Sequence, residues 1–220
     1  MSVLPVTLLV VARAPVPGQA KTRLAATVGD RVAAEIAAAA LLDTLDAVAA
    51  APVADRVVAL TGELDDALGA AEIGRRLASF TVIAQRGNDF ADRLAHAHAD
   101  AADGRPVLQI GMDTPQVTAD LLTGCARQLV DAPAVLGFAR DGGWWVLGVR
   151  KPANAQCLRT VPMSKPDTGT LTLKALQRNG IEVKLVDELA DFDVVDDVAT
   201  VREACHPTSR FAHVTRAAGL

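Results

Sequence analysis

The apolar positions of the chain form two kinds of pattern. Short continuous apolar runs are typical of strands buried on both faces, whereas apolar residues at helical spacing indicate amphipathic helices. The runs predict strands at 6–12, 56–60, 80–84, 106–110, 134–138, 144–149 and 182–186. Helical spacing predicts helices at 30–50, 65–77, 89–102, 119–130, 170–178 and 195–203, and Gly69 and Gly74 weaken the second of these.

Strands that alternate with helices predict a layered α/β fold with a mostly parallel sheet. The fifth and sixth strands are separated only by a short turn, so at least one strand should run in the reverse direction. We therefore expect a single three-layer α/β/α domain with a mixed sheet at 1–206, followed by a polar C-terminal tail at 207–220. In open sheets of this kind, ligands bind beyond the carboxyl ends of the strands.

Composition and charge narrow the possible functions. The 220 residues are 50% hydrophobic, which is enough apolar material for one core. The net charge of −4 provides no positive field, so we expect no nucleic-acid partner. No apolar stretch is long enough to span a membrane, and no basic residue precedes the first apolar run. The sequence therefore predicts a cytoplasmic protein.

Cysteine and histidine provide no obvious chemistry. Cys125, Cys157 and Cys205 are far apart and odd in number, so we expect reduced thiols rather than disulfides or a zinc site. His96 and His98 lie two positions apart on a predicted helix and do not share a face. They are expected at the surface rather than as ligands.

A basic loop follows the first strand. The segment 13–23 reads Arg-Ala-Pro-Val-Pro-Gly-Gln-Ala-Lys-Thr-Arg, and its two prolines stiffen it. Lys binds phosphate oxygens as a point charge and Arg binds them as a forked donor, so Arg13, Lys21 and Arg23 are candidates for phosphate binding. The competing interpretation is an ordinary solvated loop. The loop matches neither the Walker pattern nor G-x-G-x-x-G, which disfavours a P-loop fold and a dehydrogenase.

Two acidic segments follow later strands. Asp113 comes directly after the strand at 106–110, and Asp193 lies in the segment 191–197, which reads Asp-Phe-Asp-Val-Val-Asp-Asp. A divalent metal bound to phosphate usually takes one or two protein carboxylates, so this pair could hold Mg²⁺ or Mn²⁺. Asp113 equally fits a cap of the helix that follows. In the second segment the two interpretations are compatible, with Asp193 pointing inward and Asp196 or Asp197 capping the last helix.

The turn before the sixth strand is a further candidate. It reads Asp141-Gly142-Gly143, and its two glycines would allow a ligand to approach the backbone closely. A plain hairpin turn explains the same residues. Trp144 and Trp145 should face opposite sides of the strand, one in the core and one toward a pocket.

Taken in order, these clusters resemble nucleotide-diphospho-sugar transferases of the GT-A fold, over about residues 8–202. The most specific match is A-P-V-P-G-x-x-K-T-R-L at 14–24, a motif of a bacterial family labelled glycosyltransferase-like. G-x-D-x-P at 111–115 and D-G-G-aromatic-aromatic-x-L-G at 141–148 also match. Related groups are the molybdenum-cofactor guanylyltransferases and the phospholactate or phosphoenolpyruvate guanylyltransferases.

The resemblance implies a nucleotide site and assigns a role to each cluster. It implies that Arg13, Gly18, Lys21 and Arg23 hold the phosphates, Gln85 and Gly87 lie near the base, Asp113 and Asp193 hold Mg²⁺ or Mn²⁺, and Asp141, Gly142, Gly143 and Trp144 lie on the acceptor side. Lys21, Arg23 and Asp113 would carry the catalysis by stabilising charge during an in-line attack.

The implied activity is that of a metal-dependent nucleotidyltransferase, which would transfer a nucleoside monophosphate from an NTP to a phosphorylated small-molecule acceptor. One alternative is a glycosyltransferase that uses a nucleotide-sugar, and another is a non-catalytic nucleotide-binding protein. The chain departs from its relatives at Val194-Val195, which replaces Thr-Pro, at Trp144-Trp145, which replaces a Tyr pair, and in the segment 163–168. These departures lie mainly on the acceptor side and bear on the acceptor more than on the nucleotide.

Overall fold

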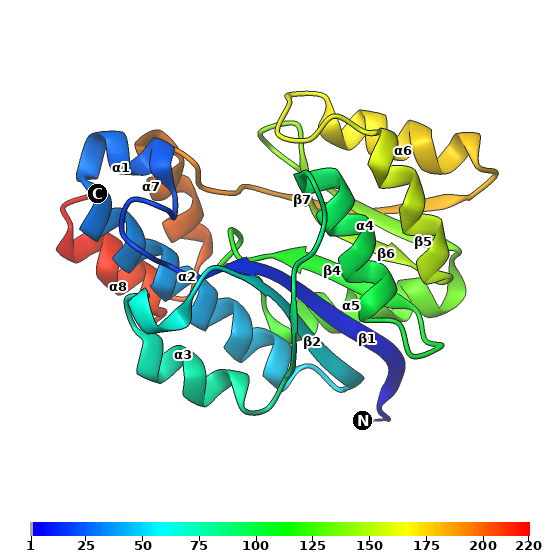
Figure 1. Ribbon diagram of the computed structural model, residues 1–220, viewed down its shortest axis with the longest axis horizontal. Helices are drawn as coiled ribbons and strands as arrows, with labels where there is room; N and C mark the ends of the chain where they lie inside the picture. The colour runs from blue at the N-terminus through cyan, green and yellow to red at the C-terminus, as the bar shows by residue number, and fades with distance from the viewer. Residues whose placement is uncertain (1) are drawn as a thin grey trace.

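Seven strands form one sheet in the order β3-β2-β1-β4-β6-β5-β7 in the computed structural model, which describes residues 2–220 (Figure 1). The strands are β1 (Leu4–Arg13), β2 (Val53–Thr61), β3 (Thr81–Ala84), β4 (Val107–Gly111), β5 (Ala134–Ala139), β6 (Trp144–Val149) and β7 (Val183–Leu189). Strand β6 runs antiparallel to both of its neighbours, and the other pairings are parallel. The predicted mixed, mostly parallel sheet is therefore confirmed.

Helices cover both faces of the sheet and complete the predicted three-layer α/β fold (Figure 1). They are α1 (Thr22–Val28), α2 (Asp30–Ala50), α3 (Ala70–Leu77), α4 (Phe90–Asp100), α5 (Ala119–Asp131), α6 (Thr168–Arg178), α7 (Val195–Ala204) and α8 (Arg210–Ala217), with two 3₁₀ helices, η1 (Leu64–Asp66) and η2 (Pro152–Thr160). None of the helices within residues 2–220 has the length and apolar character needed to cross a membrane.

The core lies on both sides of the central strand. Along β1, Leu8 and Val10 pack with α2 and α5, whereas Leu9 and Val11 pack with α4, η2 and α6. This two-sided burial explains why the strand is a continuous apolar run. The many alanines of α2 present little side-chain bulk, so this helix can lie close to the sheet.

Two helical segments differ from their predictions. The helix expected at 65–77 is interrupted, because Gly69 has a φ of 72° and separates η1 from α3. The short helix α1 begins at Thr22, inside the segment expected to be a phosphate loop. Both differences arise at a residue with left-handed backbone, Gly69 before α3 and Lys21 before α1, and hydrophobic spacing does not reveal such a conformation.

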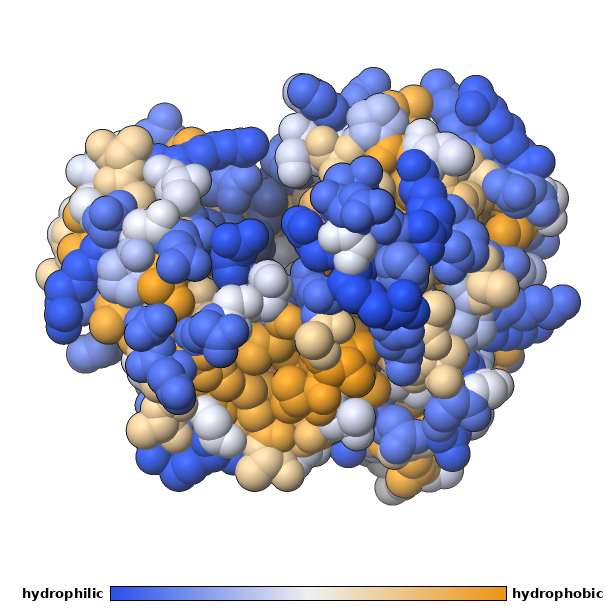
Figure 2. All heavy atoms as spheres, viewed as in Figure 1, coloured by the Kyte–Doolittle hydropathy of each residue, from blue (hydrophilic) through white to orange (hydrophobic). Residues whose placement is uncertain are grey.

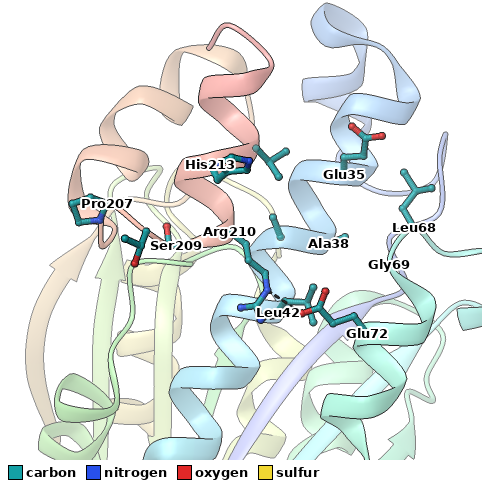
Figure 3. Close-up of a pocket in the computed structure, with 13 residues that line it drawn as sticks. Glu35, Ala38, Leu42, Leu68, Gly69, Glu72, Pro207, Ser209, Arg210 and His213 are labelled. Carbon is teal, nitrogen blue, oxygen red and sulfur yellow. Dashed lines mark hydrogen bonds and ion pairs between the residues drawn. The ribbon is translucent and has the colours of Figure 1, made fainter.

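The polar tail expected at 207–220 is instead an ordered helix. Helix α8 packs against α2, with Phe211 and Ala212 buried. Arg210 forms ion pairs with Asp43 at 3.2 Å, Asp46 at 2.7 Å and Glu72 at 2.9 Å. Figure 3 shows this side chain pointing from α8 toward Glu72. Both residues line a cavity of about 660 Å³. The segment is therefore part of the domain.

His98 is buried, contrary to the surface position expected for it. It lies four residues after Leu94, on the apolar face by which α4 packs on the sheet, and it is 0% exposed. His96 lies on the half-buried side of the same helix, where Nδ1 contacts the Arg86 carbonyl at 3.1 Å. Burial lowers the pKa of His98 to about 4.

The buried His98 predicts a loss of stability in mild acid. The unfolded chain protonates this ring near pH 6.5, whereas the folded chain keeps it neutral down to about pH 4, so the unfolded state binds more protons between these values. Stability is then complete above pH 6.5 and falls by about 2 kcal/mol between pH 7 and pH 5. Urea unfolding should show that His98→Met loses less stability over this interval. An equal loss in wild type and variant would contradict the assignment.

Candidate functional site

A cleft of about 770 Å³ opens at the carboxyl ends of the central strands. Figure 2 shows the hollow at the top of the molecule, between the part that carries α1 and α7 and the part that carries α6. Among the predicted residues, its lining includes Arg13, Lys21, Arg23, Gln85, Asp113, Asp141, Gly143, Trp144 and Asp193. The fold therefore brings the separate clusters of the sequence together in one cleft.

Three predicted glycines do not line the cleft, but they adopt a positive φ in segments whose neighbouring residues do. Gly18 adopts a φ of 76° in the basic loop. Gly87 lies against the start of α4, where an added Cβ would be 2.8 Å from the Arg93 backbone nitrogen. Gly142 has a φ of 90° and packs against the carbonyl of Pro166. Their contribution is backbone conformation rather than direct lining.

The basic loop leaves the end of β1 and enters α1. Its backbone is fixed by hydrogen bonds from the amides of Gln19 and Ala20 to the Val16 carbonyl, at 3.0 and 3.1 Å. Arg13 is exposed at the mouth of the cleft, and the Arg23 side chain is 63% exposed. Both guanidinium groups can therefore reach an anion in the cleft.

Lys21 lies deeper than the two arginines and contacts both predicted metal ligands. Its Nζ lies 2.9 Å from Asp113 Oδ2 and 2.8 Å from Asp193 Oδ1, and it donates to the Phe192 carbonyl at 2.5 Å. The Phe192 ring centroid lies 4.3 Å from the same nitrogen. Burial alone would lower the pKa of Lys21, but the charges of Asp113 and Asp193 more than offset this effect and raise it.

The two aspartates come from different parts of the fold and both contact the Lys21 ammonium. Asp113 follows β4, and Asp193 lies between β7 and α7. Asp193 also accepts a hydrogen bond from Arg23 Nη1 at 3.0 Å through Oδ2. Asp197 performs the capping role, since its Oδ2 accepts from the amides of Asp193 and Val194 at 3.0 and 3.1 Å. Asp193 is thereby free to face the cleft.

The donor set suits a divalent metal of the magnesium type. Such a metal takes oxygen ligands and is often held by two carboxylates together with water and phosphate oxygens. Asp113 and Asp193 already hold one cationic group between them, which shows that they can share a cation. Residues 2–220 contain no cluster of three or more His, Cys, Asp or Glu side chains that could bind a metal without such additional ligands.

The loop after β3 presents Gln85 in a fixed orientation. Its Nε2 donates to the carbonyls of Ala12 and Ala59 at 2.8 and 2.9 Å, which uses both amide hydrogens and ties the side chain to β1 and β2. The amide oxygen is left as the group that can accept a hydrogen bond from a ligand. Arg93, which also lines the cleft, lies 5.7 Å from the Phe90 ring centroid.

The opposite wall is built from the turn at 141–143 and the segment 163–168. The Gly169 amide donates to the Gly142 carbonyl at 2.8 Å and holds the two segments together. Trp144 is partly exposed in the cleft, whereas Trp145 is 3% exposed and donates to the Asp187 carbonyl at 2.8 Å. The two rings pack in the core clusters on opposite sides of the sheet, as predicted, and Trp145 also borders the cleft.

Two further residues of the cleft lining have no individual role in the sequence analysis. Asp191 appears there only as a member of the acidic segment 191–197. In the structure, burial, followed by the charge of Asp141, raises the pKa of Asp191 to about 6. Lys165 lies in the cleft lining just before α6. Lys165 lies between Pro162 and Pro166, shortly before α6, so the sequence could have indicated a lysine on a loop. It could not have indicated which wall of the cleft that loop forms.

Comparison with known proteins finds one family model and several solved structures that resemble the chain. The family described as "Uncharacterized protein conserved in bacteria (DUF2064)" matches residues 44–165. No curated protein matches the chain. A protein of Desulfovibrio desulfuricans G20, proposed to be a nucleotide-diphospho-sugar transferase, is 25% identical with a TM-score of 0.84, and the match covers 99% of this chain and 95% of that one.

Two more distant structures share the fold. A CMP:2-keto-3-deoxy-manno-octonic acid synthetase complexed with CTP is 13% identical, with a TM-score of 0.57 and coverage of 90% of this chain and 97% of that one. Rv0371C of Mycobacterium tuberculosis H37Rv, in complex with manganese, is 19% identical, with a TM-score of 0.54 and the same two coverages.

Proposed function

The chain belongs to the DUF2064 family, and we propose that it is a metal-dependent nucleotidyltransferase that transfers a nucleoside monophosphate from an NTP to a phosphorylated small-molecule acceptor. One observation carries the proposal: Asp113, which follows β4, and Asp193, which precedes α7, both contact the Lys21 ammonium of the basic loop at the carboxyl edge of the sheet. The CTP-bound and manganese-bound relatives share this fold and support the choice of ligands.

Arg13 and Arg23 would bind the polyphosphate. Arg13 and Arg23 are exposed at the mouth of the cleft, on the same side as the aspartates. An acceptor oxygen would attack the α-phosphorus in line, the bond to the bridging oxygen would break, and pyrophosphate would leave with the negative charge. Forked guanidinium donors stabilise such a leaving group. Asp113 and Asp193 would hold Mg²⁺ or Mn²⁺, which when bound would neutralise phosphate charge.

The acceptor would occupy the wall opposite the basic loop. Trp144 offers an aromatic surface there, and Lys165 offers a cation that could pair with an acceptor phosphate. Gln85, on the other side, would accept a hydrogen bond from the base through its amide oxygen. The nucleotide and the acceptor would then meet above Asp113.

The test of this proposal is the melting temperature of the protein with each common NTP, with and without Mg²⁺ or Mn²⁺. A ligand at 100 times its dissociation constant stabilises the fold by about 2.7 kcal/mol, which is a shift of about 5–10 °C in a domain of this size. We expect one nucleotide to produce such a shift only when metal is present. If no nucleotide shifts the melting temperature under any metal condition, the proposal fails.

Asp113→Asn should abolish the metal-dependent part of that shift and lower the rate of nucleotidyl transfer about 100-fold, because the amide cannot neutralise a metal as the carboxylate does. The matched control is Asp120→Asn, which removes an exposed acid on α5 outside the cleft. The control should keep the full shift. A full metal-dependent shift in Asp113→Asn would remove Asp113 from the site.

Similarity to the Desulfovibrio protein also supports a second candidate, glycosyl transfer from a nucleotide-sugar. The same cleft would then hold a sugar diphosphate, and a nucleoside diphosphate would be released in place of pyrophosphate. Incubation with each nucleotide and nucleotide-sugar, followed by measurement of pyrophosphate and nucleoside diphosphate, separates the two. Nucleoside diphosphate as the product would favour the glycosyltransferase.

A further inference from the structure

The Lys21 ammonium is surrounded by protein oxygens. Its Nζ donates hydrogen bonds to Phe192 O at 2.5 Å and Asp193 Oδ1 at 2.8 Å, and it forms an ion pair with Asp113 Oδ2 at 2.9 Å, so each of its three N–H groups has a protein oxygen available. The side chain is only 8% exposed. In this structure Lys21 therefore binds protein oxygens alone, although it lies in the segment expected to hold phosphate.

The same contacts occupy the carboxylates. One oxygen of each aspartate contacts Lys21, and the second oxygen of Asp193 contacts Arg23 at 3.0 Å. Among the contacts of residues 2–220, Asp113 Oδ1 is the one oxygen of the pair that has no protein partner. A divalent metal that uses both carboxylates would have to take the position of the Lys21 ammonium.

The charges of the cluster balance without a metal. Lys21 and Arg23 contribute two positive charges, and Asp113 and Asp193 contribute two negative charges. A divalent cation alone would create an excess positive charge in a partly buried site, where Coulomb interactions are strong. A cation that arrives with a polyphosphate brings the compensating negative charge and also provides new oxygen partners for the ammonium.

The backbone of Lys21 is suited to a change of state. It has φ 49° and ψ 49°, a left-handed conformation that costs a non-glycine residue about 1 kcal/mol or more. The residue stands immediately before α1, at the junction between loop and helix. The ion pairs and the Phe192 contact hold it there, so loss of the ion pairs would remove the main restraint on the side chain.

We propose that Lys21 is an internal counter-cation, which occupies the position between Asp113 and Asp193 in the free protein and exchanges it for the metal when the metal–nucleotide complex binds. The ammonium then moves from the carboxylates to phosphate oxygens. This inference rests on the proposed function, because the exchange requires a metal-bound polyphosphate. It makes Lys21 a positioning residue in the free state and explains how a lysine in the basic loop can hold the two aspartates together without bound metal.

The test measures binding of Mn²⁺ alone, without nucleotide. The electron paramagnetic resonance signal of free Mn²⁺ reports how much of the metal remains unbound. Wild type should bind Mn²⁺ weakly. Lys21→Met should bind it about tenfold or more tightly, because the competing charge is gone and both carboxylates become available. A merely structural role for Lys21 would predict equal or weaker binding in the variant, so a gain in affinity is diagnostic.

Arg23→Met is the matched control, since it removes one positive charge from the same cluster but leaves Lys21 between the aspartates. Its gain in Mn²⁺ affinity should be clearly smaller than that of Lys21→Met. The double variant Lys21→Met with Asp113→Asn should return to weak binding. If Lys21→Met does not fold, as judged by circular dichroism, Lys21→Gly suits the left-handed backbone and carries the same comparison.

Equal Mn²⁺ affinity in wild type, Lys21→Met and Arg23→Met would overturn the exchange. That result would leave the proposed reaction intact, because nucleotidyl transfer and the nucleotide-dependent thermal shift are measured separately. Conversely, Lys21→Met could bind Mn²⁺ tightly while no nucleotide raises the melting temperature of the protein. That result would support the position of Lys21 as counter-cation and contradict the proposed function.

Discussion

Gly142→Ala is expected to lower the free energy of unfolding by about 3 kcal/mol. A Cβ at this position would overlap the carbonyl oxygen of Pro166, and the clash involves backbone rather than a flexible side-chain end. Overpacking of this kind costs about 1–3 kcal/mol, and the φ of 90° adds about 1 kcal/mol for any residue with a side chain. Urea unfolding at constant pH measures the sum.

Gly180→Ala separates the two contributions. Gly180 has a similar left-handed φ of 72°, but apart from its two chain neighbours no residue of the described chain has an atom within 4 Å of the Cβ that alanine would add. This variant should therefore cost only about 1 kcal/mol. Equal losses in the two variants would mean that the contact between Gly142 and Pro166 does not constrain the fold.

The effect of Gly142→Ala should also reach the cleft. The turn at 141–143 and the segment 163–168 form one wall, and the clash would push them apart. The basic loop and Asp113 belong to other elements, so the half of the cleft proposed to bind the nucleotide should be less affected. In a variant that stays folded, the KM for the acceptor is expected to rise more than the KM for the nucleotide.

The sheet and most of its helices were predictable because their signals are local. The continuous apolar run of β1 follows from burial on both faces, and the bounds predicted for α2, 30–50, agree with the structure. The short connection between β5 and β6 predicted the reversed strand. Each of these inferences needs only the spacing of residues within one or two elements.

The position of Lys21 could not be predicted in the same way. Its partner Asp193 lies 172 residues away in the sequence, and the sequence gives no sign that the two side chains meet. Topology indicates that strand ends share one edge of the sheet, which is why Asp113 and Asp193 could be paired as candidates. Which cation lies between them depends on the approach of α1 to α7, and that approach is a property of the packed molecule.

The helix α8 was missed for a related reason. Its segment contains few large apolar residues, and the buried Phe211, Ala212 and Thr215 form a face only when α2 and α7 are in place. Hydrophobic spacing over such a short stretch is too weak to indicate a helix. The charged Arg210, which looked like part of a solvated tail, is instead neutralised by acids on α2 and α3.

Phe211→Ala is expected to lower the free energy of unfolding by about 3–5 kcal/mol, the range for removing a large aromatic side chain from a core. Phe211 is 0% exposed, and its ring centroid lies 4.7 Å from that of Phe192. The cavity would open between α8 and α7, where Val198 and Val201 are also buried. Phe90→Ala is the control, because Phe90 is 41% exposed and should cost about 1 kcal/mol or less.

The loss should extend to the candidate site, because Phe192 connects the two regions. Its ring packs on Phe211, its carbonyl accepts from Lys21 at 2.5 Å, and it is the neighbour of Asp193. Loosening this ring removes one support of the cluster that holds Lys21 between the aspartates. Urea unfolding, together with Mn²⁺ binding in the same preparations, tests both effects. A cost below about 1 kcal/mol would show that α8 is dispensable to the fold, in contradiction to its buried contacts.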